Sequence, residues 1–448
     1  MTRRSIFWFR RDLRLADNPA LLAAIAESDE IIPVFILDDG IAERAGEFRR
    51  AYLASSLREL DASLDQRLHV YSGDAVSVLK SLMKRYGATS LHVAADFAPY
   101  GVARDRRVEE SGIELTRTGS NYAVSPGRVR KSDDSPYRVF TPFFRAWVNH
   151  SWRAPVLAPA QIHTVTAQKS DRNFPKWESV RPLQSAGEAA ALSRWGTFQE
   201  SGLESYDQGR NYPARQGTSR LSPHLRWGEI HPRTLLANLG NSEAEQTFRK
   251  EIAWREFYAD VLHHNPHTSR DYYTPRFATM AYDPPGENFA AWCEGRTGFP
   301  FVDAAMRQLL REGWMHNRAR MVVASFLVKD LHIEWQHGAN FFMKYLIDND
   351  VASNSHGWQW TAGCGTDASP YFRIFNPIEQ GKRFDPQGDY IRDYIPELSH
   401  LSSVQIHEPW LLDEALVGKY PRPIINHATE RVEALARLAA IKEVRPGS

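Results

Sequence analysis

The sequence has almost no cysteine, and Cys293 and Cys364 are the only two in 448 residues. Two cysteines cannot build a disulfide scaffold or hold an iron–sulfur cluster, and such scarcity is typical of a reducing cytoplasm. No apolar run approaches the length that spans a membrane, and residues 1–5 lack the apolar core of a signal peptide. We therefore expect a soluble, cytoplasmic protein that does not associate with membranes.

Net charge is also nearly absent, because 55 Lys and Arg residues against 54 Asp and Glu residues leave +1. Any surface that binds nucleic acid must then be a local basic patch. The sequence lacks G-x-G-x-x-G and G-x-x-x-x-G-K-[ST], which argues against a plain dinucleotide or nucleotide-triphosphate site. It also lacks H-E-x-x-H and any Cys/His cluster, so we expect no metal site.

Alternating short apolar runs and helical intervals fill residues 1–125. At this spacing they predict a doubly wound parallel sheet, an α/β domain that binds ligands at the carboxyl ends of its strands. Asp17, with Pro19 close behind, is the expected N-cap of the first helix. The expected strands lie at residues 6–9, 31–37, 68–71, 91–94 and 113–115.

The rest of the chain has almost no strand signal. Prolines punctuate residues 126–200, which we interpret as an interdomain connector. Residues 201–448 are expected to form a larger, all-α domain. Its helices are predicted at residues 246–265, 302–331, 338–348 and 428–442.

Residues 348–360 combine acidic residues, a carboxamide and two tryptophans. In a helix, Asp350, Asn354 and Trp358 would share one face and offer a carboxylate, an amide and an oxidisable indole to one ligand. A redox-active aromatic cofactor would use all three. The alternative is an acidic helix start in which Trp358 and Trp360 are ordinary core residues.

Three further segments could bind ligands. Residues 217–225 resemble a helix entrance whose N–H groups and hydroxyls suit a pyrophosphate, with simple N-capping as the alternative. Glu251, Trp254 and Arg255 fall on one helix face and could cradle a nucleobase; a surface Glu–Arg pair beside a core Trp is the alternative. Residues 314–321 repeat the arrangement, with Asn317, Arg320 and Met321 on one face, Trp314 one turn earlier, and His316 without a second histidine at metal spacing.

These segments together resemble the photolyase/cryptochrome family of flavoproteins, and most nearly its bacterial, class I-like cyclobutane pyrimidine dimer photolyases. The resemblance runs from Phe7–Arg14 to Val404–Trp410 and is strongest over residues 246–387. It implies an N-terminal α/β domain, a long connector, and a helical domain that binds FAD. The residues that it implies for FAD binding are Tyr206, Thr218, Ser219, Arg220, Leu221, Ser222, Trp254, Asn317, Arg320, Asp348, Asp350 and Asn354, with Asp348 paired to Arg320 and Asn354 facing flavin N5.

The resemblance also implies a light-driven enzyme, a deoxyribodipyrimidine photo-lyase, that acts on UV-damaged DNA. Excited reduced FAD would donate an electron to a flipped-out cyclobutane dimer, the ring would split, and the electron would return. Asn317 and Met321 stand where photolyases specific for 6-4 lesions place histidines, which argues against that activity. The implied lesion-site residues are Glu251, Trp254, Asn317, Met321 and Trp360, with Asn354 at the flavin. The implied further DNA contacts are Arg210, Arg318, Arg373 and Gln380, each of which could equally be a solvated surface residue.

Three aromatic residues match the family's photoreduction chain: Trp358, Trp335 and, where tryptophan is usual, Tyr282. Tyr282 is either the terminal donor or merely a packed aromatic residue. The runs at residues 10–12, 35–38 and 96–101 resemble members that bind an 8-hydroxy-deazaflavin antenna, with a folate or an empty site as alternatives. The rival function is a cryptochrome-type blue-light receptor without repair activity. We expect a monomer.

Overall fold

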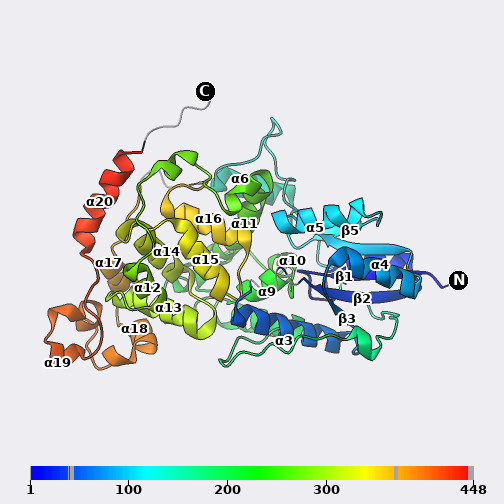
Figure 1. The fold of residues 1–448 in the computed structure, drawn as a ribbon, viewed down its shortest axis with the longest axis horizontal. Helices are drawn as coiled ribbons and strands as arrows, with labels where there is room; N and C mark the ends of the chain where they lie inside the picture. Colours follow the sequence, from blue (N-terminus) through cyan, green and yellow to red (C-terminus); the bar gives the residue numbers. More distant parts are fainter. Residues whose placement is uncertain (1, 39, 41–44, 368–371, 442–448) are drawn as a thin grey trace. The chain divides into compact units, whose positions relative to one another are not determined.

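The computed structural model describes residues 2–38, 40, 45–367 and 372–441. The chain forms two compact units (Figure 1). Unit 1 comprises residues 1–204, 219–266 and 347–350, and unit 2 comprises residues 205–218, 267–346 and 351–448. Among the described residues no helix is long and apolar enough to cross a membrane.

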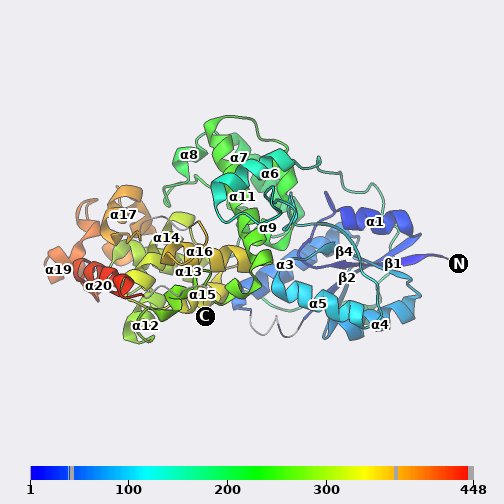
Figure 2. The same cartoon turned by 90° about the horizontal axis from the view of Figure 1, so that it is seen from above.

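Unit 1 is built on a five-stranded parallel sheet with the order β3-β2-β1-β4-β5. Strand β2 is buried at seven of its eight positions, as expected for a parallel strand covered on both faces. Helix α1 lies on one face of the sheet, and α4 and α5 lie on the other (Figure 2). The sheet and its helices are β1 (Arg4–Phe9), α1 (Pro19–Glu27), β2 (Glu30–Leu37), α3 (Glu47–Ser63), β3 (His69–Ser72), α4 (Ala75–Tyr86), β4 (Ser90–Ala95), α5 (Pro99–Glu110) and β5 (Thr116–Ser120).

The predicted doubly wound sheet is confirmed, but two details of the prediction are wrong. The fifth strand is Thr116–Ser120 and not residues 113–115. Ile113 and Leu115 are buried in the core just before it, which explains their apolar character. The N-cap of α1 is Asn18, whose side chain accepts a hydrogen bond from the N–H of Leu21, and not Asp17.

The remaining elements of unit 1 are helical. In α11 a capping box of Ser242 and Glu245 satisfies the first N–H groups, which explains why the helix begins where it does. These elements are α6 (Phe140–His150), η1 (Lys169–Asp171), α7 (Glu188–Ser201), α9 (Ser222–Trp227), α10 (Pro232–Leu236) and α11 (Glu243–His264).

Unit 2 is helical and has one large apolar core, in which Trp292 and Met306 are fully buried. The single helix predicted for residues 302–331 is wrong, because Gly313 ends α13 in a left-handed conformation and a new helix begins at Asn317. The elements are α8 (Tyr206–Gly209), η2 (Pro266–Ser269), η3 (Pro275–Thr279), α12 (Glu287–Glu294), α13 (Pro300–Glu312), α14 (Asn317–Ser325), the π-helical η4 (Phe326–Asp330), α15 (Trp335–Tyr345), α16 (Val351–Ala362), α17 (Pro377–Phe384), α18 (Asp389–Tyr394), η5 (Pro396–Leu398), η6 (Gln405–His407), η7 (Pro409–Leu411), α19 (Glu414–Val417) and α20 (His427–Ala439).

Candidate functional site

The expected phosphate-binding segment begins with a close backbone contact in unit 2. A Cβ added at Gly217 would lie 2.4 Å from the carbonyl oxygen of Gly209, so this approach requires glycine. The contact closes the loop that starts at Tyr206, a buried residue whose ring lies 5.4 Å from the Arg210 guanidinium. Tyr206, Arg210 and the following Thr218 are therefore held on one short, closed loop.

In unit 1 the segment continues through a strained residue into α9. Arg220 has a left-handed backbone with a φ of 50°, and its carbonyl accepts a hydrogen bond of 3.0 Å from the side-chain amide of Gln184. The hydroxyl of Ser222 donates to the Asp348 carboxylate at 2.6 Å. Helix α9 has only six residues, and Pro223 in its first turn lacks an N–H. The O–H of Ser222 is therefore directed at Asp348, and the short helix start has one N–H fewer to offer a ligand.

A buried carboxylate fixes Gln184 beside this segment. Glu229 accepts hydrogen bonds from Tyr52 (2.9 Å), Ser56 (2.5 Å) and Nδ1 of His224 (2.6 Å). Nε2 of His224 lies 2.9 Å from the Gln184 amide nitrogen, which also donates to a carbonyl. Because an amide N–H can only donate, Nε2 is the acceptor and the histidine proton is on Nδ1. The sequence analysis missed this network, because no local pattern connects its members.

The acidic pair of residues 348 and 350 is held by groups of unit 1. Arg11 forms a short ion pair with Asp350, and Nε of Arg226 donates to the carbonyl of Asn349. Burial, with a contribution from Arg11, lowers the pKa of Arg226 to about 9. Neither arginine was predicted for this role. The only sequence signal was the run of residues 10–12, which the resemblance associated with the antenna.

Helix α16 begins at Val351, so Asp350 lies outside it and the expected face is reduced to Asn354 and Trp358. Nδ2 of Asn354 donates to the carbonyl of Ala339 on α15 at 3.1 Å. Asn354 Oδ1 has no hydrogen-bond partner in the part of the chain that the structure describes. The amide oxygen of Asn354 can therefore accept a hydrogen bond from a ligand.

Trp358 packs against bare backbone of α15. A Cβ added at Gly338 would lie 2.1 Å from Cη2 of Trp358. Gly338 follows Trp335 by three residues, so Trp358 lies against the face of α15 that also carries Trp335. Both indoles are buried, and within the described ranges the indole N–H of each has no hydrogen-bond partner.

Tyrosine rings extend this aromatic cluster. The ring of Tyr272 lies 6.2 Å from that of Trp335 in an edge-on arrangement and 6.5 Å from that of Tyr282, which it stacks on at 19°. Tyr282 is therefore connected to Trp335 through Tyr272. The sequence analysis did not identify Tyr272.

Asn317 begins α14, and the preceding His316 caps it by accepting a hydrogen bond from the N–H of Arg318 at 3.1 Å. Trp314 is therefore not one turn earlier on the same helix, as predicted, but lies before it. Nε of Arg320 donates to the carbonyl of Met315 at 2.8 Å. The predicted pairing of Asp348 with Arg320 stays a prediction.

Arg318 joins three segments of unit 2. Its Nη2 donates to Oδ1 of Asn211 at 2.5 Å, its guanidinium lies 4.3 Å from the ring of Phe384, and its Nη1 lies 3.9 Å from the sulfur of Met321. The structure thus brings a predicted DNA-contact residue next to a predicted lesion-site residue.

The two other predicted DNA contacts in the second half of unit 2 lie near α17. Arg373 is exposed, and its carbonyl accepts a hydrogen bond from the buried Lys329 of η4. Burial lowers the pKa of Lys329 to about 7. Gln380 is half-buried on α17.

On α11 of unit 1, Trp254 stacks face to face on Phe140, with ring centroids 3.7 Å apart and an interplanar angle of 7°. Glu251 lies one turn earlier and is half-buried. Arg255 donates to the carbonyl of Asn121 at 3.0 Å. Trp360, on α16 of unit 2, is half-buried.

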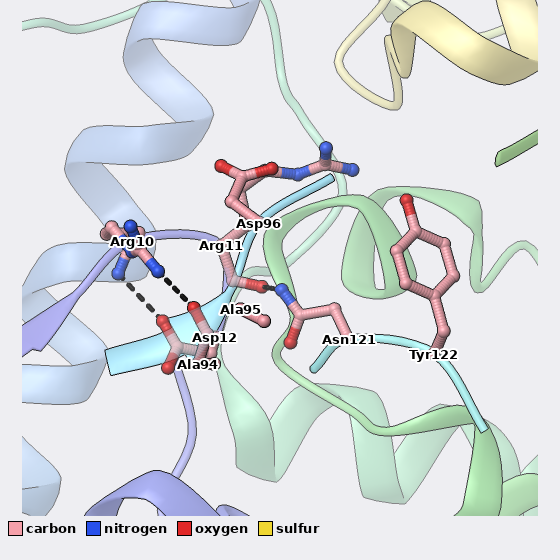
Figure 3. Close-up of a pocket in the computed structure, with 8 residues that line it drawn as sticks. All are labelled: Arg10, Arg11, Asp12, Ala94, Ala95, Asp96, Asn121 and Tyr122. Carbon is pink, nitrogen blue, oxygen red and sulfur yellow. Dashed lines mark hydrogen bonds between the residues drawn. The ribbon is translucent and has the colours of Figure 1, made fainter. Parts of the chain in front are cut away.

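A narrow pocket opens at the carboxyl ends of β1 and β4, where the strand order of the sheet reverses (Figure 3). Its charged groups are largely matched by protein partners, since Arg10 pairs with Asp105 at 2.6 Å and Asp96 with Arg104 at 3.4 Å. The lining residues are Arg10, Arg11, Asp12, Ala94, Ala95, Asp96, Asn121 and Tyr122. With one aromatic ring among them, these residues do not fit a flat tricyclic chromophore.

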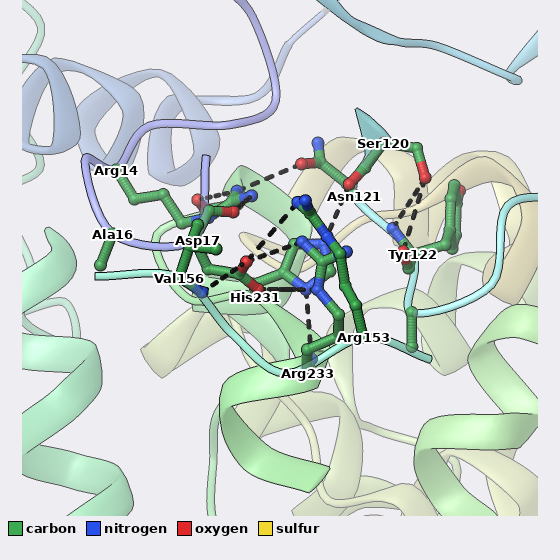
Figure 4. A network of polar contacts seen from close by, with 12 residues as sticks. Arg14, Ala16, Asp17, Ser120, Asn121, Tyr122, Arg153, Val156, His231 and Arg233 are labelled. Carbon is green, nitrogen blue, oxygen red and sulfur yellow. Dashed lines mark hydrogen bonds and ion pairs between the residues drawn. The ribbon is translucent and has the colours of Figure 1, made fainter. Parts of the chain in front are cut away.

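A second polar network surrounds Asp17, which lies on the loop between β1 and α1 of unit 1 (Figure 4). The buried Asp17 accepts two hydrogen bonds from Arg233, at 2.9 and 2.7 Å, and one from the N–H of Val156 at 3.2 Å. His231 lies 3.2 Å from the same carboxylate, but burial and neighbouring arginines hold the pKa of His231 well below its usual value. We assign this network a structural role, because it fastens the connector to the loop after β1.

The predicted FAD-binding residues belong to both units, and the chemistry of those described here fits a flavin dinucleotide. Thr218 and Ser219 carry hydroxyls, which suit phosphates, and the buried carboxylate of Asp350 suits a polar ring edge. Asn354 offers an amide oxygen without a hydrogen-bond partner among the described residues. The residues that the structure describes contain no group of three or more His, Cys, Asp or Glu side chains that could hold a metal ion.

Comparison with known protein families gives two matches. Residues 5–161 match the family model described as DNA photolyase, and residues 248–440 match the FAD binding domain of DNA photolyase. The deoxyribodipyrimidine photo-lyase of Agrobacterium fabrum is 37% identical, covering 98% of each chain. That of Streptomyces griseus is 39% identical over 95% of this chain and 97% of its own.

Solved structures give similar matches. A bacterial class III photolyase from Agrobacterium tumefaciens has a TM-score of 0.92, 38% identity and 98% coverage of both chains. An archaeal photolyase from Sulfolobus tokodaii, described with two FAD molecules, has a TM-score of 0.87 at 32% identity, covering 97% of this chain and 99% of its own. A cryptochrome from Synechocystis sp. PCC6803 has a TM-score of 0.88 at 27% identity with the same coverage.

Proposed function

The chain belongs to the DNA photolyase family, and we propose that it repairs cyclobutane pyrimidine dimers in DNA, using blue light and bound FAD. It is then a deoxyribodipyrimidine photo-lyase, like the curated relatives that match it along nearly their whole length. The division of labour that we propose has an α/β domain at residues 1–125, a connector at 126–200, and a helical domain for FAD and the lesion at 201–448.

The observation that carries the choice of lesion is the pair of side chains on α14. Repair of a 6-4 lesion requires an acid that titrates near neutral pH, which an imidazole supplies. Asn317 and Met321 have no such group, and His316 is committed to capping the helix. This pair therefore favours cyclobutane dimers.

The residues that we propose to hold FAD are Tyr206, Thr218–Ser222, Trp254, Asn317, Arg320, Asp348, Asp350 and Asn354. When bound, reduced FAD supplies an excited-state electron donor. The oxygen of Asn354 is placed to accept a hydrogen bond because its amide nitrogen is occupied by Ala339. Arg11 orients the Asp350 carboxylate through their ion pair.

The protein's remaining task is to hold a dimer that has left the DNA stack. Trp254 and Trp360 offer ring faces to the flipped bases, and Glu251 offers a carboxylate to their edges. Arg210, Arg318, Arg373 and Gln380 bind phosphates or sugar. Arg318 reaches this role already oriented by Asn211, which lowers the entropy that binding would otherwise cost.

Photoactivation uses Trp358 and Trp335, with Tyr282 as the terminal residue. The support is the packing of Trp358 on the face of α15 that carries Trp335. The deazaflavin antenna stays a prediction, with a folate as the alternative. The polar lining of the pocket in Figure 3 does not favour the deazaflavin.

The test uses purified, FAD-loaded, chemically reduced protein and two oligonucleotides, one with a thymine cyclobutane dimer and one with a 6-4 lesion. Under blue light we expect loss of the dimer only. Loss of the 6-4 lesion alone would overturn the lesion assignment, and loss of neither would favour a cryptochrome-type receptor.

A matched pair of variants tests the lesion site. Glu251→Ala should weaken dimer binding by about tenfold or more, because a hydrogen bond to a charged group contributes about 1.5–3 kcal/mol. FAD content should not change. Glu243→Ala, which removes an exposed acid from the first turn of the same helix, is the control and should bind normally. Equal binding by both variants would remove Glu251 from the lesion site.

A further inference from the structure

The oxidisable rings of unit 2 differ in where their protons can go. The indole N–H groups of Trp358 and Trp335 are buried and lack hydrogen-bond partners in the described part of the chain. An oxidised indole at either position cannot pass its proton to a neighbour and stays a radical cation. A radical cation is a stronger oxidant than the neutral radical, so it can oxidise a phenol in contact with it.

Tyr272 is the phenol in ring contact with Trp335, at 6.2 Å, and is itself almost fully buried. Its hydroxyl donates a hydrogen bond of 2.7 Å to Oε1 of Glu334, the residue directly before Trp335. The ring of Tyr272 also stacks on that of Tyr282, with 6.5 Å between the ring centroids, so the two phenols are in contact.

Burial raises the pKa of both phenols, so both are neutral before oxidation. An oxidised phenol is a very strong acid and must lose its proton at once. The hydrogen bond from the Tyr272 hydroxyl gives that proton an acceptor, the Glu334 carboxylate. Glu334 is half-buried, so it can exchange the proton with solvent.

We propose that Tyr272 relays the electron between Tyr282 and Trp335, and that Glu334 is the proton acceptor of Tyr272. The inference rests on the proposed function, because the primary oxidant is a light-excited oxidised flavin acting through Trp358. An electron passes from Tyr272 to the Trp335 radical cation and restores the neutral indole. The O–H bond of Tyr272 breaks, its proton forms a carboxylic acid on Glu334, and Tyr272 becomes a neutral radical.

The second step moves the radical to the half-buried end of the pair. Tyr282 gives an electron to the Tyr272 radical through the stacked rings and loses its phenolic proton to solvent, so Tyr282 becomes the neutral radical. Tyr272 takes its proton back from Glu334 and is a neutral phenol again. An external thiol or other one-electron reductant then reduces Tyr282. The arrangement explains how tyrosine can stand where the family usually has tryptophan.

The test is flash photolysis of oxidised, FAD-loaded protein, read by the electron paramagnetic resonance of the tyrosyl radical and by its rate of formation in H₂O and D₂O. We expect a neutral tyrosyl radical that forms more slowly in D₂O. Glu334→Gln and Tyr272→Phe should each slow its formation by at least about tenfold, as loss of a positioned base does. Glu287→Gln, an exposed acid on α12, is the control and should behave as wild type.

Wild-type kinetics in Glu334→Gln, or identical wild-type rates in H₂O and D₂O, would overturn the proposal. The isotope comparison needs no variant, so a misfolded Glu334→Gln protein would not remove the test. Dimer repair by the same proteins after chemical reduction distinguishes failure of the tyrosine relay from failure of the proposed repair function. Normal repair with unchanged radical kinetics defeats only this inference, whereas absent repair by reduced wild-type protein defeats the proposed function.

Discussion

At the carboxyl end of the sheet in unit 1, buried charges are paired with one another, whereas in unit 2 the indole N–H groups of Trp335 and Trp358 lack partners among the described residues. The first arrangement pairs Arg10 with Asp105 and Asp96 with Arg104, so most of the charge at the pocket is neutralised locally. In the second arrangement, neither indole N–H has an acceptor among the described residues, whereas the hydroxyl of Tyr272 donates to the Glu334 carboxylate. Buried ion pairs thus stabilise the fold in unit 1, whereas in unit 2 the buried polar groups define the route that we propose for electrons and protons.

The largest effect is expected where the charge pairing of unit 1 is broken. Asp105→Asn removes the ion-pair partner of Arg10, which lies at 2.6 Å, and both side chains are almost fully buried. Removing one member of a buried ion pair costs about 3–5 kcal/mol. Urea unfolding of the variant should show a loss of this size.

The control for this prediction is Arg3→Gln, which breaks the exposed pair between Arg3 and Asp29. Exposed pairs contribute about 0–1 kcal/mol, so little change is expected. If Asp105→Asn and Arg3→Gln lowered the free energy of unfolding equally, the ion pair at the pocket would have no special structural role.

Asp260 of unit 1 has no close cationic partner among the described residues, so replacing it should raise the free energy of unfolding, whereas replacing Asp105 should lower it. Asp260 accepts a hydrogen bond from the N–H of Gly127 at 2.7 Å, and burial raises the pKa of Asp260 to about 6. The folded state therefore holds more protons than the unfolded state between about pH 4 and 6, and the free energy of unfolding falls as the pH rises through that window.

Asp260→Asn keeps an oxygen for Gly127 and removes the charge. We expect it to raise the free energy of unfolding at pH 7 by about 2 kcal/mol and to flatten its fall between about pH 4 and 6. Urea unfolding at several pH values measures both. A variant less stable than wild type at pH 7 would show that the charged form is stabilised after all.

Packing between α15 and α16 of unit 2 gives a smaller effect. Gly338→Ala places a methyl group where Cη2 of Trp358 now lies, and such overpacking costs about 1–3 kcal/mol. Trp358 must move, so photoreduction should slow as well. The control is Gly357→Ala on α16, where an added Cβ meets nothing within 4 Å and should stabilise the helix by about 0.5–1 kcal/mol. An unchanged rate of photoreduction in Gly338→Ala would mean that Trp358 does not take part in electron transfer to the flavin.

The sequence predicted the sheet well where strands are buried on both faces, because β1, β2 and β4 are largely apolar runs bounded by polar loops. It misplaced β5, whose residues Thr116–Ser120 include no large apolar side chain, and chose the apolar residues just before it. It also joined α13 and α14, since the apolar periodicity continues across Gly313 while the backbone does not. Local pattern therefore finds buried strands and misses breaks that a single residue causes.

The candidate site shows a different limit. Its residues were assigned by resemblance, and those assignments remain predictions. Tyr272 and Glu334 could not be predicted, because the contact joins positions 62 residues apart and leaves no local periodicity. The same holds for Gln184 and Glu229, whose network depends on tertiary packing around α9. Side chains that act through other side chains are visible only in the folded chain.

The most direct test of the central claim is dimer loss from a thymine-dimer oligonucleotide with chemically reduced, FAD-loaded protein, measured in blue light and in darkness. The account predicts repair in light and none in darkness, with equal repair by Trp358→Phe because the flavin is already reduced. Repair in darkness, or no repair in light by fully loaded wild-type protein, would contradict it.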